Sequence, residues 1–103
     1  MSSRAQIRID FQQAINQAKR LDDIADKLDR TAKKSMENSI QNLASAWKGD
    51  NASAFLKKEE RLKEKISTTS EHVRAIADDI RRVARAIYDA EMESWRIANE
   101  RKS

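Results

Sequence analysis

Trp47-Lys48-Gly49 is the stretch of this sequence that decides the fold. Gly49 is the only glycine among 103 residues, and the chain has no proline. Glycine enters the left-handed conformation that ends a helix at little cost. Asp50 and Asn51 follow at once, and their side-chain oxygens can accept hydrogen bonds from the first free amides of a new helix. The sequence therefore predicts a helix, a tight turn at residues 47–51 and a second helix.

Before the turn, apolar residues recur in steps of three and four from Phe11 to Ala46. This spacing predicts a helix over residues 10–46 that buries one face. Residues 1–9 alternate between polar and apolar, so we expect an extended segment there and Asp10 as the helix cap. Several positions on the buried face hold Ala or Ser, which lets two helix backbones approach closely.

After the turn, a stripe of the same kind runs without a fault from Ala52 to Ile87. It predicts a second helix over residues 52–98, with a frayed tail at residues 99–103. We expect Lys63, Arg74, Asp78, Arg81 and Arg85 on its outer, solvated face. The fold class is thus all-α, an antiparallel helical hairpin that forms a single domain over residues 1–103.

Each apolar stripe is wider than one neighbouring helix can cover, so two hairpins are expected to associate into a four-helix bundle. Glu59 falls on the stripe, where a polar residue fixes the register or meets an opposite charge on a partner; the alternative is that it lies at the open end of the bundle near the turn. The residues predicted for the dimer or core seam are Phe11, Leu21, Leu28, Leu43, Phe55, Leu62, Ile66, Val73, Ile76, Ile80, Val83 and Ile87.

The amino-acid composition argues against most kinds of catalytic, cofactor or metal site. There is no cysteine, and His72 is the only histidine. No catalytic serine constellation and no glycine-rich phosphate loop is visible, so the sequence predicts no enzyme, no cofactor and no metal. No apolar run is long enough to span a bilayer, and the N-terminus lacks the apolar core of a secretory signal, which predicts a cytoplasmic protein by general secretion rules. The net charge of +4 comes from interleaved signs, which argues against nucleic acid as a partner.

Together these features resemble the WXG-100 family, the small helical hairpins exported by type VII secretion and related to the early secreted antigenic target. The residues that carry the resemblance are Trp47 and Gly49, between two heptad helices. The resemblance implies a secreted or cell-surface substrate that acts as a dimer. It also implies contacts with the type VII secretion ATPase, with another helical hairpin or with a larger toxin.

The family's second signature is a tyrosine followed four residues later by an acid, which serves as the export signal. Tyr88 lies in the matching region, but Met92 occupies the acidic position. Glu91 is three residues after Tyr88 and shares its helix face, so this pair is the candidate signal; the alternative is that Tyr88 is flanking core. An adaptor or chaperone for a larger effector and a basic nucleic-acid-binding coiled coil remain alternatives for the whole chain.

Overall fold

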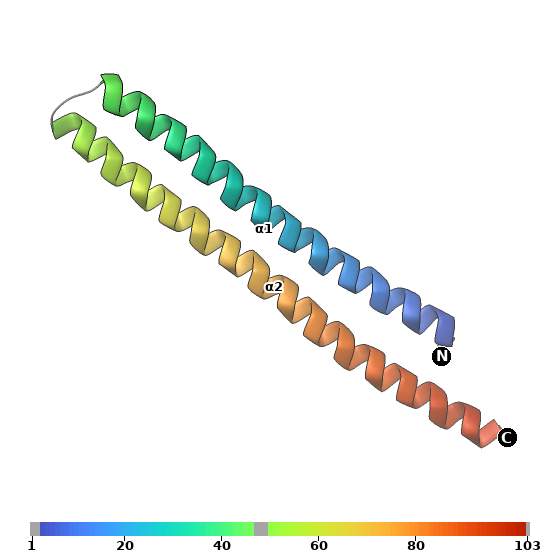
Figure 1. The fold of residues 1–103 in the computed structure, drawn as a ribbon. Coiled ribbons are helices and arrows are strands. Elements are labelled where there is room, and N and C mark those ends of the chain that lie inside the picture. The colour runs from blue at the N-terminus through green and yellow to red at the C-terminus, as the bar shows by residue number, and fades with distance from the viewer. Residues whose placement is uncertain (1–2, 47–49, 103) are drawn as a thin grey trace. The chain divides into compact units, whose positions relative to one another are not determined.

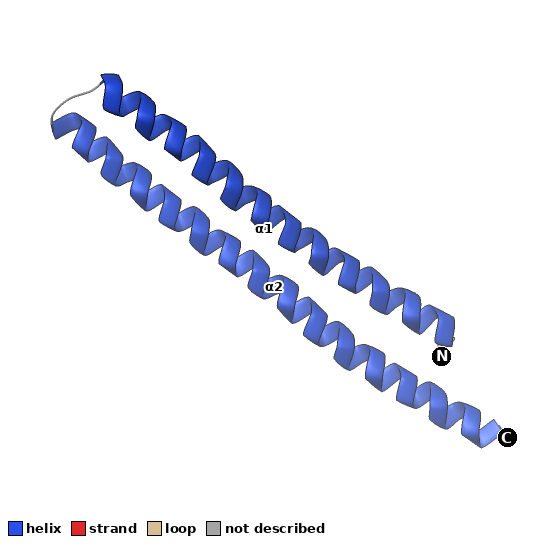
Figure 2. Ribbon diagram, in the orientation of Figure 1, coloured by secondary structure: helices blue, strands red, loops and turns tan. Residues whose placement is uncertain are grey.

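The computed structural model describes residues 3–46 and 50–102, apart from the side chains of residues 39–40, 43–46, 50–52 and 102. Two helices make up this part of the chain, α1 (Arg4–Ala46) and α2 (Asp50–Lys102), and no strand occurs in it (Figures 1 and 2). The predicted all-α helical hairpin is confirmed. The predicted turn at Trp47-Lys48-Gly49 and the seam residue Leu43 lie outside what is described.

The first helix begins earlier than the sequence predicts. The backbone amide of Gln6 donates to Ser3 Oγ at 3.1 Å, and the amide of Ile7 donates to the Ser3 carbonyl at 3.0 Å. Ser3 is therefore the N-cap, and the expected extended segment with a cap at Asp10 is wrong. The alternation of residues 7–9 misled the prediction, because Ile7 is buried and continues the helical spacing of Phe11.

The second helix is longer than predicted at both ends, since Asp50 and Asn51 already belong to it and it continues to Lys102. The helix continues through residues 99–102, and the fraying of this tail stays a prediction. Arg96 Nη2 lies 2.5 Å from Glu93 Oε1, and its Nη1 lies 2.5 Å from Glu100 Oε1. Such contacts between side chains three and four positions apart stabilise the last turns of a helix.

Contacts divide the chain into two compact units. Unit 1 comprises residues 1–22 and 75–103, and unit 2 comprises residues 23–74. In unit 1 the start of α1 lies beside the end of α2, and the two segments are antiparallel because Arg4 contacts Trp95 while Asp22 contacts Arg81. Unit 2 likewise pairs the later part of α1 with the earlier part of α2. That the chain is one domain stays a prediction.

The fully buried residues of each unit are small. Ala18 and Ala77 are fully buried in unit 1, and Ala25 and Ser70 are fully buried in unit 2. On α2 these residues recur one heptad apart, at positions 70, 77 and 84. Side chains this short let two helix backbones approach closely, so the hairpin packs along a line of small residues.

The large aliphatic residues of the predicted seam occupy a different face of α2. Ile76, Val83 and Ile87 are 53%, 49% and 52% exposed, and Leu62 is exposed as well. Phe11, Leu21, Leu28, Phe55, Ile66, Val73 and Ile80 are half-buried. One chain alone therefore leaves part of this stripe uncovered, and its burial in a dimer stays a prediction.

The small-residue contact predicts a specific sensitivity to side-chain volume. Replacement of the fully buried Ala77 by Leu should lower the free energy of unfolding by about 1–3 kcal/mol, because the added atoms force the helices apart. The matched change Ala86→Leu, at an exposed position of the same helix, should leave it nearly unchanged. Urea unfolding followed by circular dichroism measures both, and equal midpoints for the two variants would contradict the packing.

Candidate functional site

Tyr88 and Glu91, the candidate export signal, lie one helical turn apart on α2 and line the same cavity of unit 1. The cavity has a volume of about 270 Å³. Both residues are half-buried. The other lining residues come from both helices, and they are Ile7, Asp10, Phe11, Ala14, Ala84 and Ile87. The fold therefore places the candidate pair beside side chains of α1, which sequence reasoning did not include in the site.

The Tyr88 ring packs against α1 through an aromatic contact. Its centroid lies 4.8 Å from that of Phe11, with the ring planes inclined by 44°. The Arg85 guanidinium carbon lies 4.8 Å from the Phe11 centroid and 5.8 Å from that of Tyr88. Aromatic faces attract cations at such distances. Arg85 is exposed, which agrees with its predicted outer-face position, and its guanidinium also contacts both rings. Phe11, Arg85 and Tyr88 thus form one cluster across the two helices.

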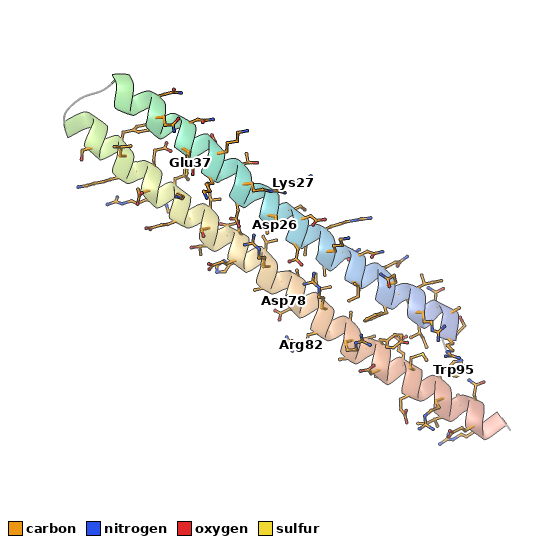
Figure 3. All side chains as sticks on the ribbon, viewed as in Figure 1. Asp26, Lys27, Glu37, Asp78, Arg82 and Trp95 are labelled. Atoms are coloured by element: carbon orange, nitrogen blue, oxygen red, sulfur yellow. The ribbon has the colours of Figure 1, made fainter. Side chains whose placement is uncertain are left out.

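The positions beyond Glu91 complete this end of unit 1. Met92 is half-buried, and Trp95 is half-buried with the Arg4 guanidinium carbon 5.5 Å from its ring centroid (Figure 3 labels Trp95). The acid of the family signature is thus replaced by an apolar, partly covered side chain. That Tyr88 and Glu91 act as an export signal stays a prediction. The turn motif Trp47 and Gly49 lies outside the described residues.

Charged residues in unit 2 connect the helices through Arg74. Its Nη2 lies 2.8 Å from Asp26 Oδ1 and 2.7 Å from Asp29 Oδ2. Figure 3 shows Asp26 directed towards α2, whereas its neighbour Lys27 points away. The Ser70 hydroxyl and the Arg74 guanidinium hold the pKa of Asp29 below its usual value. Asp26 and Asp29 in turn raise the pKa of Arg74, which stays charged.

A similar contact occurs in unit 1, where Arg81 bonds Asp22 of α1 and, at 2.9 Å, Asp78 of its own helix. The predicted outer-face position of Arg74 and Arg81 is therefore wrong, because both are half-buried between the helices. The signal that sequence reasoning missed is complementary spacing. Aspartates at 22, 26 and 29 share one face of α1, and arginines at 74 and 81 are one heptad apart on α2.

Within the described residues, no group of three or more His, Cys, Asp or Glu side chains could hold a metal ion. None of the helices in that part of the chain is long and apolar enough to cross a membrane. The Tyr88 cavity consists of aliphatic and aromatic walls with two carboxylates. Such a surface suits noncovalent recognition.

Two long helices paired antiparallel define the class of small helical-hairpin proteins. The family described as "WXG100: Proteins of 100 residues with WXG" matches residues 6–92, and the chain belongs to it. The resemblance seen in the sequence is thereby confirmed. No curated protein and no solved structure matches the chain.

The Asp29 contacts predict a pH-dependent contribution to stability. Because folding lowers the pKa of Asp29, its contribution is complete above the usual aspartate pKa of about 4 and disappears as the pH falls through the folded value. Asp29→Asn should therefore lower the urea midpoint at pH 7, and this effect should shrink as the pH falls below the usual aspartate pKa. The exposed Asp23→Asn is the control and should leave the midpoint unchanged throughout this pH range. An Asp29→Asn effect that does not depend on pH would contradict this assignment.

Proposed function

We propose that this chain is a non-enzymatic substrate of type VII secretion that acts as a dimer of helical hairpins. It is made in the cytoplasm and is then exported, after which it is a secreted or cell-surface protein. Membership of the WXG100 family supports the association with type VII secretion. The observation that supports the proposed dimer is an apolar groove on unit 1 that a single chain leaves open.

This groove has a volume of about 360 Å³ and runs mainly along α2. Its lining residues are Ala14, Ile76, Asp79, Ile80, Val83, Ala84 and Ile87. Asp79 is the one charged member, and it bonds Arg82 at 3.0 Å. Burying one large aliphatic side chain contributes about 1.5–3 kcal/mol, so a second hairpin that covers three or four of them gains a substantial stabilisation. The product is a four-helix bundle.

The dimer is tested by the double variant Val83→Gln/Ile87→Gln. Both residues are half-exposed in one chain, so the change should leave the helices intact and remove the apolar contact with the second copy. Native protein should have twice the mass of the 11.9 kDa chain by light scattering, and the variant should shift to the monomer at equal concentration. Circular dichroism on the same samples reports helicity.

The matched control is Asp89→Gln/Arg101→Gln, which introduces the same residues at exposed positions of the same helix and keeps the net charge. Arg82 is left in place because it pairs with Asp79 of the groove. This variant should remain a dimer, because neither residue lines the groove. Native chain that stays monomeric, or equal dissociation of both variants, would count against the groove as the dimer contact.

We propose that export depends on two features of the chain. The secretion ATPase binds the surface around Tyr88 and Glu91, and the turn motif Trp47 and Gly49 is also required. Glu91→Gln should reduce the secreted fraction roughly tenfold, as expected for loss of one charge-assisted contact. Asp89→Asn, an exposed acid on the same helix, is the control and should be exported normally. Immunoblots of culture supernatant and cell pellet measure both, and normal export of the Glu91 variant would rule out this part of the proposal.

An adaptor that pairs with another helical hairpin, or with a larger toxin, is the second candidate. The half-buried Met92 at the family's acidic position favours it, because such a chain would depend on a partner's signal. In that case the chain alone would be monomeric or aggregated. It would become a soluble, helical species of defined mass only with the partner present.

A further inference from the structure

We propose that the cavity of unit 1 binds one long basic side chain, an arginine or a lysine, of a separate protein that recognises this chain during export. The inference rests on the function proposed above and names the chemistry of the partner. The cavity is the one that Tyr88 and Glu91 line. Its lining residues on α2 fall between Arg82 and Trp95, which Figure 3 labels.

The size and walls of the cavity suit a single side chain. Its volume of about 270 Å³ is below the roughly 300–1,000 Å³ of pockets that hold drug-sized ligands. Ile7, Phe11 and Ile87 provide apolar walls. Arginine and lysine bury their methylene stems along such walls while the charged head reaches a polar rim.

The charged lining residues select a cation. Asp10 of α1 and Glu91 of α2 are the charged residues that line the cavity, and both are carboxylates. Asp10 Oδ1 accepts a hydrogen bond from Gln6 Nε2 at 2.8 Å, which leaves its second oxygen for a ligand. Across the described ranges, residues 3–46 and 50–102, no ion pair involves Asp10 or Glu91. Two carboxylates from opposite helices can both bond one guanidinium or ammonium group.

The aromatic pair adds to this preference. Phe11 and Tyr88 line the cavity, and the same two rings already carry the guanidinium of Arg85. The electron-rich faces of aromatic rings attract cations. Arg85 does not itself line the cavity, and its contact shows that these two rings attract a guanidinium in the folded chain.

A separate protein fits the cavity better than a second copy does. The groove assigned to the second copy is lined by aliphatic residues, and its one carboxylate, Asp79, is already paired with Arg82. The cavity instead offers two carboxylates, Asp10 and Glu91, that form no ion pair within the described part of the chain. This difference in chemistry separates the two surfaces, although Ile87, Ala14 and Ala84 line both.

The test uses the full chain with an isotope-labelled tyrosine ring. Because Tyr88 is the only tyrosine, its ring NMR signals report this cavity alone. The probe is N-acetyl-arginine amide, and the matched neutral probe is N-acetyl-citrulline amide. The arginine probe should shift the ring signals saturably and the citrulline probe should not. Asp10→Asn and Glu91→Gln should each weaken binding roughly fivefold or more, whereas Asp89→Asn should bind as the native chain does.

Three results would overturn the inference: no saturable shift, equal shifts by both probes, or equal weakening by Asp89→Asn. A change of dimer mass in the Asp10→Asn and Glu91→Gln variants would assign the basic side chain to the second copy and overturn the separate partner. If Glu91→Gln abolishes export while the probe does not bind, the proposed function stands and the cavity inference falls. The probe could also bind as expected while Asp10→Asn and Glu91→Gln are both exported normally. The cavity would then bind a basic side chain, but not one of a protein that recognises this chain during export.

Discussion

The close approach of two long helices through small residues is the constraint on which the rest of the structure depends. Ala18 and Ala77 in one unit, and Ala25 and Ser70 in the other, are fully buried. Alanine and serine contribute little apolar area, so this contact alone stabilises the hairpin weakly. Further stabilisation within one chain comes from larger apolar side chains beside this line, such as the buried Ile7 and Met36. The partly exposed interhelical Arg–Asp contacts add little.

The same constraint divides α2 into two apolar faces. Ala77 and Ala84 face α1, while Ile76 and Val83, one position earlier, are half-exposed. Consecutive helical residues point about 100° apart, so a single helix can present small residues to its own hairpin and large ones elsewhere. The large face has the width and the chemistry of a helix-bundle contact. This arrangement separates the residues that set the distance between α1 and α2 from those available to a second hairpin.

The periodic pattern was sufficient to predict two helices and their antiparallel pairing, because heptad spacing has few alternatives in a chain with one glycine and no proline. It could not show which apolar stripe is buried within the chain. Ile76 and Ala77 both lie on apolar stripes, and only the packing distance distinguishes them. The helix start was missed because Ile7-Arg8-Ile9 also fits a strand, while the Ser3 cap needs the helix to be recognised first.

The residues of the candidate site were even harder to predict from the sequence than the buried stripe. Tyr88 and Glu91 could be selected from sequence because they share one helix face. Phe11 and Asp10 lie far away in the chain, and only the antiparallel register brings them to the same cavity. It follows that the cavity exists only while α1 and α2 are paired, since each helix supplies part of its wall. A ligand that fills it binds the folded hairpin and stabilises it by mass action. Recognition at this site therefore depends on the small-residue contact that holds the two helices together.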